Sequence, residues 1–475
     1  MPSRCTRLTL WIALTLPVAA ARGADYDDPF GTSKLRPATP STFWSGPSTA
    51  CASSVRVPDP LRLADAIDIA LCNNPQTRQS WANAKAAAAQ VGIARSTYLP
   101  NLTAGTSVLR TETWNTPTSG GANELTASLT FNYLLFDFGG RDATLELAQQ
   151  SLLAADWAHN ANLQTVLLNS VQAYYLLYAT QEAVQANLAA EKASLASLDA
   201  SKARLRVGSA TRADMLQAQT AYSQAQLNRT QIEGDAATAR GVLANALGLS
   251  AEQPLHIAPP PDLEARTVGE EAVRQLIELA RSRRPDLAAA EAQVRAAQSN
   301  VTIQESAGKP SVSLFGAAGL IQSNPGFDPR TGAVGLQVNV PLFTGFQIQY
   351  QILQARELVE LQQATRDKLA TDVSLDVWRA YQDLRTQGQS LTTANELVAS
   401  AQESYNVTLA RYKAGVGAIT DLLNAQSALA SANLQQIQAR YRWNVAKATL
   451  AKAIGVLEPE LVSQRTPSDN TPKSR

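Results

Sequence analysis

The chain has 475 residues, a formal net charge of +1 at pH 7 and 17% charged residues. This near-neutral balance, without a dense run of lysine and arginine, argues against a nucleic-acid-binding surface and against polyanionic partners. The length would suit two or three ordinary domains, but the chain repeats itself, so two copies of one unit are the better count.

Residues 1–23 have the features of a secretory signal peptide. Arg4 and Arg7 precede an apolar stretch at 8–21, and small residues near its end offer a cleavage site. A membrane anchor is the other interpretation. It is the weaker one because the apolar stretch is shorter than the roughly 20 residues of a spanning helix.

Residues 24–60 are rich in proline, serine and threonine and lack a periodic pattern, which predicts an extended or disordered arm. Cleavage of the signal peptide would leave two cysteines, Cys51 in this arm and Cys72 in the first helical stretch. In an oxidising compartment such a pair can form a disulfide. The alternative is two unpaired thiols, with Cys72 buried on a helix face.

The central part of each half predicts long helices. Two proline-free stretches, 118–253 and 342–458, are crowded with alanine, glutamine and leucine, the composition of long helices. A helix at about 141–207 would be ~100 Å long at 1.5 Å per residue. It would end at Gly208, since glycine readily adopts the left-handed conformation that ends helices.

A second helix, at about 211–247, is only about half as long and needs an end-to-end companion beside the long helix. The segment at about 63–98, with its break at Asn74-Pro75, has a suitable length. Each unit is therefore predicted to hold one long helix packed beside two stacked shorter ones.

Between these helical stretches the period changes to two. Four runs of about 10 residues alternate apolar with polar side chains, which is the length of a transmembrane barrel strand. The second run of each pair is predicted to extend to Leu135 and to Leu342. Aromatic residues near the run ends suit an interfacial belt: Tyr98, Trp114, Phe136, Phe138, Phe327, Phe343 and Phe346. The alternative is a small amphipathic sheet packed on a helix in a soluble protein.

The two halves of the chain carry the same pattern. An offset of 207 residues superimposes Gly208 on Gly415 and Asp214 on Asp421, so one unit is written twice. The predicted division is a signal peptide (1–23), an arm (24–60), a first repeat (61–253; strands at about 101–136, long helix at about 141–207), a linker (254–270), a second repeat (271–456; strands at about 311–343, long helix at about 346–414) and a flexible tail (457–475).

Four strands per chain cannot close a barrel, because about eight are the practical minimum. Two chains would supply eight strands, whose interior is largely filled by side chains, and three chains would supply twelve and a wider lumen. The chain is therefore expected to close its barrel by self-assembly, with the long helices forming a tube that continues from the strands.

No catalytic constellation is recognisable, so neither an enzyme nor a cofactor is expected. The two histidines, His159 and His256, lie far apart without cysteine or acidic companions at ligand spacing, which argues against a metal site. His159 is predicted to lie on a helix surface. The sequence has no phosphate-binding GxxxxGK loop and no serine elbow.

The stretch from Leu61 to Val456 resembles the TolC-type outer membrane factors. The resemblance rests on the duplicated unit, the two strand hairpins, the turns "RLRVG" and "RYKAG", and the following "LQAQ" and "LNAQ". It implies a mainly α fold with a small β part, in which a homotrimer builds a twelve-stranded outer membrane β-barrel and a periplasmic α-barrel of long antiparallel coiled-coil helices. It also implies two partners, a periplasmic membrane fusion adaptor and an inner membrane ABC transporter.

By this resemblance the helical hairpin turns form the periplasmic tip where the adaptor docks: Val207, Gly208, Ser209, Gly415 and Val416. The helix after the second turn would place Asp421 at a closed entrance, where three copies would form a ring attractive to cations. The alternative is that Asp421 only balances the helix dipole, a role that suits Asp214 better.

Two positions depart from the family pattern at this entrance. Asn424 stands where some members carry a second acid, so the ring should be less charged. Gly417 stands where they carry an arginine that holds the gate shut. Tyr412 matches the tyrosine of that latch but lacks this partner, which predicts a weaker or differently built latch.

The resemblance implies a passive export channel that draws its transport energy from a partner. The chain length, the arm and the two mature cysteines are most similar to family members that export a protein toxin by the type I route. One alternative is a small-molecule or multidrug efflux duct of the same family. Another is a non-conducting periplasmic coiled-coil scaffold or adaptor, which would not need alternating strands with aromatic ends.

Overall fold

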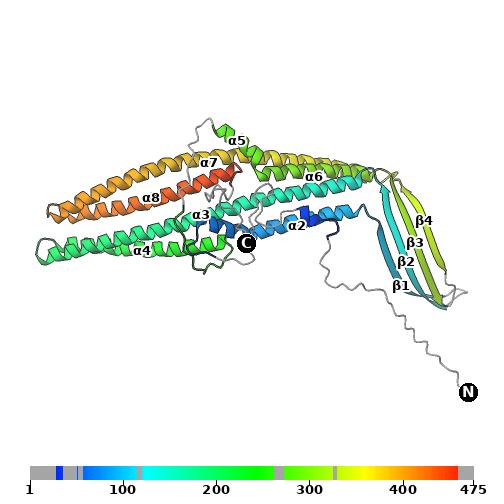
Figure 1. The fold of residues 1–475 in the computed structure, drawn as a ribbon, viewed down its shortest axis with the longest axis horizontal. Coiled ribbons are helices and arrows are strands. Elements are labelled where there is room, and N and C mark those ends of the chain that lie inside the picture. The colour runs from blue at the N-terminus through cyan, green and yellow to red at the C-terminus, as the bar shows by residue number, and fades with distance from the viewer. Residues whose placement is uncertain are drawn as a thin grey trace, which may run out of the picture.

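The computed structural model describes residues 28–35, 51, 57–114, 120–260, 272–324 and 329–457. They form an elongated molecule with paired long helices at one end and a four-stranded sheet at the other (Figure 1). The predicted signal peptide, most of the N-terminal arm, Phe327 and the C-terminal tail lie outside the described residues. No helix in the described part of the chain combines enough length and apolarity to span a bilayer.

Each half contributes six helices and strands in the same order, which confirms the predicted duplicated, mainly helical fold. The first half contains α1 (Leu63–Asn73), α2 (Pro75–Ser96), β1 (Asn101–Thr113), β2 (Gly120–Phe136), α3 (Gly140–Arg206) and α4 (Arg212–Ala246). The second half contains α5 (Ala272–Arg283), α6 (Pro285–Ala307), β3 (Ser311–Asn324), β4 (Arg330–Asn339), α7 (Gln347–Lys413) and α8 (Ile419–Ala453). α3 and α7 have 67 residues each, so each is ~100 Å long.

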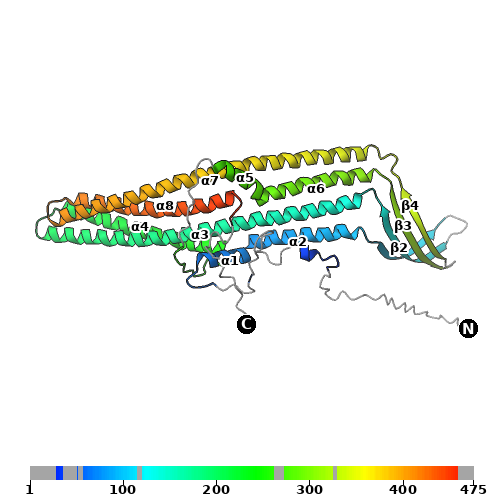
Figure 2. The same cartoon turned by 45° about the horizontal axis from the view of Figure 1, so that its top comes forward.

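The helices follow the order of the strands that they continue. Toward the sheet, α2, α3, α6 and α7 lie side by side in that order, and the strands form one antiparallel sheet in the order β1-β2-β3-β4 (Figure 2). Toward the opposite end, α4 and α8 replace the short helices, and contacts between α3 and α8 join the two halves.

Glycine ends both long helices at the turns farthest from the sheet. Gly208 has φ +74° and Gly415 has φ +80°, a conformation that costs glycine little. In each turn an amide reaches back five residues to a helix carbonyl, from Ser209 to Arg204 (2.9 Å) and from Val416 to Arg411 (3.1 Å). This pattern closes the helix C-terminus in both repeats.

In the middle of the molecule, each proline break between short helices is fastened to the end of the neighbouring helix. Asn74 Nδ2 donates to the carbonyl of Ala246 (2.9 Å). At the equivalent place in the second half, Arg284 Nη1 donates to the carbonyl of Ala453 (3.5 Å). The two repeats therefore build the same joint with different side chains.

A glycine after each short helix permits this close approach. Gly248 has φ +70°, and a Cβ there would lie 2.7 Å from the carbonyl oxygen of Asn73. Gly455 has φ +74°, and its Cβ would lie 3.0 Å from the carbonyl oxygen of Arg283. Both positions need glycine for conformation and for space.

The main hydrophobic core lies beside the first joint, around Tyr174 of α3. The Tyr174 ring is fully buried, and its hydroxyl donates to the carbonyls of Leu61 (2.9 Å) and Ala258 (2.7 Å). Burial raises the pKa of this phenol well above its ordinary value. Leu61 also pairs with Ile257 in a parallel bridge, so the described start of the predicted linker is held against the first repeat.

A second, smaller core surrounds Tyr381, which occupies the same place in α7 as Tyr174 in α3. The hydroxyl of Tyr174 bridges two segments, whereas the second core gathers apolar residues of α5, α7 and α8. The repeat thus extends from the helix boundaries to the packing.

The prediction that His159 lies on a helix surface is wrong. His159 is 1% exposed, and its Nδ1 lies 2.8 Å from Ser80 Oγ of α2. The same face of α3 buries Asp156 and Asn160. This part of the α2–α3 interface is therefore polar, which the alanine-rich surroundings of His159 did not indicate.

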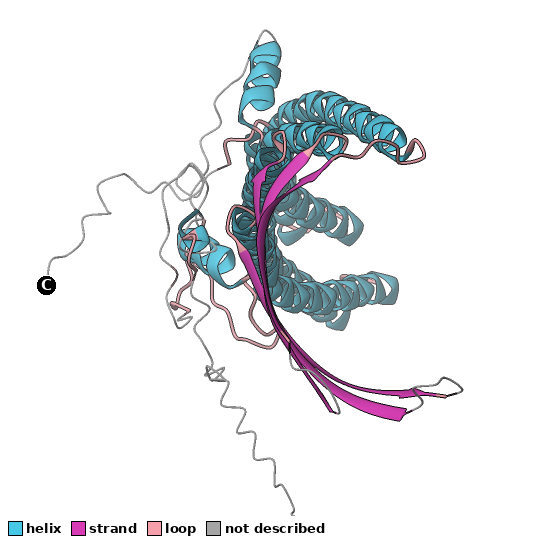
Figure 3. Cartoon of the chain, turned by 90° about the vertical axis from the view of Figure 1, so that its right-hand side faces the viewer, coloured by secondary structure: helices cyan, strands magenta, loops and turns pink. Residues whose placement is uncertain are grey.

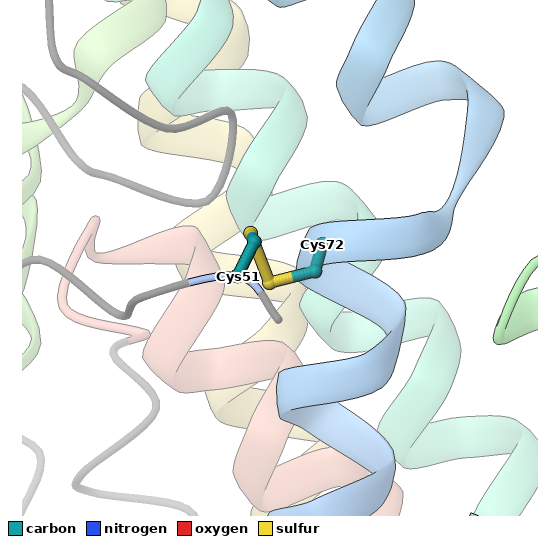
Figure 4. Close-up of a disulfide and its surroundings, with 2 residues drawn as sticks. All are labelled: Cys51 and Cys72. Carbon is teal, nitrogen blue, oxygen red and sulfur yellow. A yellow bond between two sulfur atoms is a disulfide. The ribbon is translucent and has the colours of Figure 1, made fainter. Parts of the chain in front are cut away.

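Cys51 and Cys72 are joined by a disulfide (Figure 4). Cys72 lies in α1, so the bond fixes one point of the N-terminal arm to the first short helix. A second described part of the arm, Thr32–Leu35, forms a 3-10 helix that packs on α2, where the sequence predicted extended or disordered chain.

Candidate functional site

The end of the molecule farthest from the sheet is formed by the two helical hairpin turns, α3–α4 and α7–α8 (Figure 1). All five residues predicted for adaptor docking are exposed there: Val207, Gly208, Ser209, Gly415 and Val416. The two valine side chains are 77% and 70% exposed. Each turn thus presents one apolar side chain to solvent.

In the first repeat, Asp214 caps its own helix. Asp214 Oδ2 accepts hydrogen bonds from the Thr211 amide (2.9 Å) and hydroxyl (2.8 Å), and the Asp214 amide donates back to Thr211 Oγ1 (3.2 Å). These hydrogen bonds from Thr211 lower the pKa of Asp214 below its ordinary value. The geometry is a capping box.

In the second repeat, the equivalent Asp421 makes no such cap. The residue three positions earlier is Ala418, whose methyl group cannot exchange hydrogen bonds, and α8 has no side-chain cap. No ion pair or hydrogen bond of Asp421 is found within the described residues. Asp421 and Asn424, one helical turn apart, are both exposed on α8 close to the tip.

Tyr412 is held by a clasp of three side chains, although the sequence predicted that its partner is missing. The Arg204 guanidinium of α3 lies 4.1 Å from the centre of the Tyr412 ring and donates to the Tyr412 carbonyl. The Tyr412 hydroxyl lies 3.3 Å from Ser201 Oγ, and the ring is only 5% exposed. Arg204, Ser201 and Tyr412, hereafter the clasp, therefore connect the two long helices at the tip.

Gly417 lies tightly against the end of α7. A Cβ at this position would lie 3.0 Å from the Tyr412 amide nitrogen and 3.2 Å from Arg411 Cβ. A side chain there would have to displace the backbone, so an arginine at position 417 does not fit this arrangement. The clasp instead takes its arginine from α3.

The contact between the two halves continues from the clasp along α3 and α8. Gln426 Nε2 of α8 donates to Ser197 Oγ (2.8 Å) and to the carbonyl of Ala193 (3.3 Å) in α3. Beyond these contacts a groove of about 590 Å³ runs between the two helix pairs, lined mostly by alanine, serine, asparagine and glutamine. We call this contact and its groove the α3–α8 seam.

One face of the sheet is apolar across all four strands. Register pairs Leu102 with Phe131, Phe131 with Gly316 and Gly316 with Val334, and side chains of directly paired residues share a face. The opposite face carries mainly threonine, serine, asparagine and glycine, as in the row that joins Gly105, Ser128, Gly319 and Thr331. The strands form a curved wall (Figure 3).

The ends of two strands differ from the prediction. The register shifts between Leu134 and Phe136, so Leu135 lies at a bulge and Phe136 takes its place opposite Val312. β4 ends at Asn339, short of Leu342. Pro341 explains this end, because proline has no amide hydrogen to donate to a strand ladder.

Exposed aromatic side chains lie at both ends of the sheet. At the helix end are Phe136, Phe138, Phe343 and Phe346, which pair edge to face with ring centres 4.7 and 5.4 Å apart. Trp114 lies at the far end and is 74% exposed. Such aromatic ends flanking an apolar face suit a strand that crosses from one membrane interface to the other.

The sheet is open at both edges. β1 pairs only with β2, and β4 only with β3, within the described residues. Long unpaired edges are ready to pair with another chain. The edges of β4 and β1 therefore suit pairing between neighbouring copies.

Sequence reasoning missed Arg204, Ser201 and Gln426, which hold the two halves together at the tip. The repeat aligns Arg204 with Arg411, but a basic residue in the last turn of a helix is usually explained by the helix dipole. The described residues also contain no group of three His, Cys, Asp or Glu side chains that could hold a metal ion.

Comparison with known proteins agrees with this geometry. The family model for outer membrane efflux proteins matches residues 66–249 and 276–456, which are the two repeats. The chain is 33% identical to protein CyaE of Bordetella pertussis over 91% of each chain. It is 25% identical to the alkaline protease secretion protein AprF of Pseudomonas aeruginosa, over 87% of this chain and 89% of AprF.

The fold is that of solved outer membrane channels. The open state of the MtrE outer membrane channel of Neisseria gonorrhoeae matches with a TM-score of 0.72 and 22% identity, over 88% of this chain and 96% of MtrE. Because the family model covers both repeats and thus most of the chain, the protein belongs to the outer membrane efflux protein family, as a non-enzymatic channel protein of the outer membrane with a large periplasmic part.

Proposed function

We propose that this chain forms the exit duct of an export system that moves a protein, such as a type I secreted toxin, from an inner membrane ABC transporter to the exterior. The observation that carries the proposal is the full-length similarity to relatives, one of which, AprF, is named for protease secretion. A wide duct with a neutral polar lining also suits a polypeptide. The hydroxyl-rich face of the sheet supplies such a lining.

The proposed assembly is a homotrimer. Three copies would join β4 of one chain to β1 of the next and close twelve strands, whereas two copies would close eight strands around an interior that side chains fill. The expected mass of the detergent-purified protein in light scattering, corrected for detergent, is three times that of one chain. A monomeric or dimeric mass would contradict this arrangement.

The exposed valines of the two turns are proposed to meet a periplasmic adaptor. Val207 and Val416 are large apolar side chains fixed by rigid glycine turns, and such exposed side chains are typical of contact sites. Replacing both by serine is expected to abolish adaptor capture, while the channel still inserts in bilayers.

Asp421 is proposed to line the entrance as a ring of three carboxylates, with Asn424 next to it. The ring would favour cations. Asp421→Asn is expected to lower the cation preference of single-channel currents. Asp214→Asn, the equivalent change at the capped carboxylate, is the matched control and should leave selectivity unchanged.

Complementation separates protein export from small-molecule efflux. The chain would be expressed in Pseudomonas aeruginosa without AprF and in Neisseria gonorrhoeae without MtrE, and secreted protease and drug susceptibility would be measured. Protease in the medium supports the proposed substrate class. Restored drug tolerance without protease secretion would support the small-molecule alternative.

A further inference from the structure

A second cavity lies on the α3–α8 seam, near the middle of the molecule. It has a volume of about 160 Å³. Tyr175 and Tyr178 of α3 and Tyr441 of α8 form its walls, with Pro260 from the segment after α4. We call it the tyrosine cavity. Ile437 and Tyr441 lie one heptad from Ala430 and Leu434 of the 590 Å³ groove, so both hollows follow the same helix faces.

The tyrosine cavity contains a buried hydrogen-bond acceptor. The Asn444 side chain lines the cavity and is 3% exposed, and its Oδ1 has no donor among the described residues. Buried polar atoms in folded proteins nearly always have a partner. A carbonyl oxygen that faces an empty space therefore indicates a group that enters the cavity and donates a hydrogen bond.

The electrostatics of the walls favour a cation as that group. Ring faces carry the negative part of the aromatic quadrupole and attract ammonium and guanidinium groups. Burial raises the pKa of Tyr441, so its hydroxyl stays neutral at physiological pH. Glu182 also lines the cavity and adds a carboxylate.

One wall residue, Arg440, opposes a cation. Its side chain is exposed, and a long arginine stem can keep the guanidinium in solvent. The ring faces and the amide oxygen, in contrast, are fixed by the helices. An anion would meet these negative surfaces from three sides, so Arg440 alone does not make an anion site.

We propose that the tyrosine cavity binds a guanidinium or primary ammonium group, which donates to Asn444 Oδ1 and lies against the tyrosine rings. The group could be a free small cation or the end of an arginine or lysine side chain of a periplasmic protein. The site is separate from the tip, so its occupation does not depend on the proposed docking surface.

The experiment uses the intact, detergent-purified protein and ligand-observed NMR. The probe is N-acetyl-arginine amide, and the matched control is N-acetyl-citrulline amide, which has the same shape without the charge. The arginine probe is expected to bind about tenfold more tightly, equal to about 1.4 kcal/mol. Equal binding of both probes, or binding of neither because water fills the cavity, would overturn the proposal.

Two variants localise the binding to the tyrosine cavity. Asn444→Leu removes the acceptor and should abolish the difference between the probes. Asn444→Asp keeps the shape and adds a negative charge, so it should bind the arginine probe more tightly and guards against a folding defect in the first variant. Gln438→Leu, on the same helix outside the cavity, is the control. Unchanged binding in both Asn444 variants would refute the site.

A third probe distinguishes the two sources of the cation. Acetyl-Ala-Arg-Ala-amide carries the guanidinium on a peptide and should bind like the single amino acid if the mouth admits a side chain from a protein. Binding of methylguanidine and of the single amino acid, but not of the peptide, would assign the site to free small cations.

Discussion

Removal of the Arg204 guanidinium should release the clasp at the tip. Arg204 contributes a contact with the Tyr412 ring at 4.1 Å and a hydrogen bond to the Tyr412 carbonyl. At a half-exposed site the first is worth about 1 kcal/mol and the second about 1–2 kcal/mol. If opening the tip separates α3 from α7, Arg204→Leu lowers the cost of opening by about 2–3 kcal/mol per chain, or about 30- to 150-fold.

The assay is single-channel conductance of the purified protein in planar bilayers. Arg204→Leu is expected to spend more time in a high-conductance state than the parent. Arg206→Leu is the matched control, because Arg206 is exposed in the same last turn of α3 and carries the same charge without contacting Tyr412. An equal rise in both variants would refute the clasp and indicate a general effect of lost positive charge.

A double-mutant cycle separates the two parts of the clasp. Tyr412→Leu removes the ring but keeps the backbone carbonyl that Arg204 bonds. The coupling between Arg204→Leu and Tyr412→Leu should therefore be about 1 kcal/mol, the share of the ring contact. Tyr412→Phe loses only the contact with Ser201 and should have a smaller effect than Tyr412→Leu. Zero coupling would show that the ring contact contributes nothing to the closed state.

Gly248→Ala should lower the free energy of unfolding by at least about 1–2 kcal/mol, because it forces a left-handed alanine against the Asn73 carbonyl; Gly234→Ala, in open space on α4, should be neutral or stabilising in the same denaturant titration. The disulfide closes a loop across 21 residues, so Cys72→Ala should cost about 3 kcal/mol, and the unreduced protein should show no free thiol from Cys51 or Cys72 in a denaturing thiol assay. The lowered pKa of Asp214 stabilises the fold above the unfolded carboxyl pKa of about 3.9, and this contribution is lost as the pH falls through the folded pKa; the stability gap between the parent and Asp214→Asn should therefore shrink from pH 7 to pH 3, and a constant gap would contradict the cap. Ala418→Thr should rebuild the missing cap, gain about 0.5–1 kcal/mol and draw Asp421 from the entrance, which a fall in cation selectivity would report.

The helix boundaries were predictable because single residues set them. Gly208 and Gly415 end the long helices, and Pro75 starts a short one. These residues act through their own backbone conformation, which needs no knowledge of the rest of the fold. The predicted long helix at about 141–207 agrees with α3, Gly140–Arg206, for this reason.

The clasp and the buried histidine were not predictable, because they depend on tertiary contacts. Arg204 and Tyr412 are brought together only when the two repeats pack side by side, and nothing local marks the pair. His159 lies in an alanine-rich helix whose buried and exposed faces have similar polarity, so its position around the helix could not be read. The bulge before Phe136 carries no glycine or proline that would mark it.

The comparison of the two repeats shows which constraints survived duplication. Both repeats retain the glycines of the turns and joints, whose backbone conformation no other residue adopts as cheaply. Side chains that only fill or cap have diverged: Asn74 became Arg284 at the joint, and Thr211 became Ala418 at the tip. The loss of that one hydroxyl leaves Asp421 without the hydrogen bonds that engage Asp214. A single substitution in one copy thus frees a carboxylate at the tip, while the other copy keeps a stable helix start.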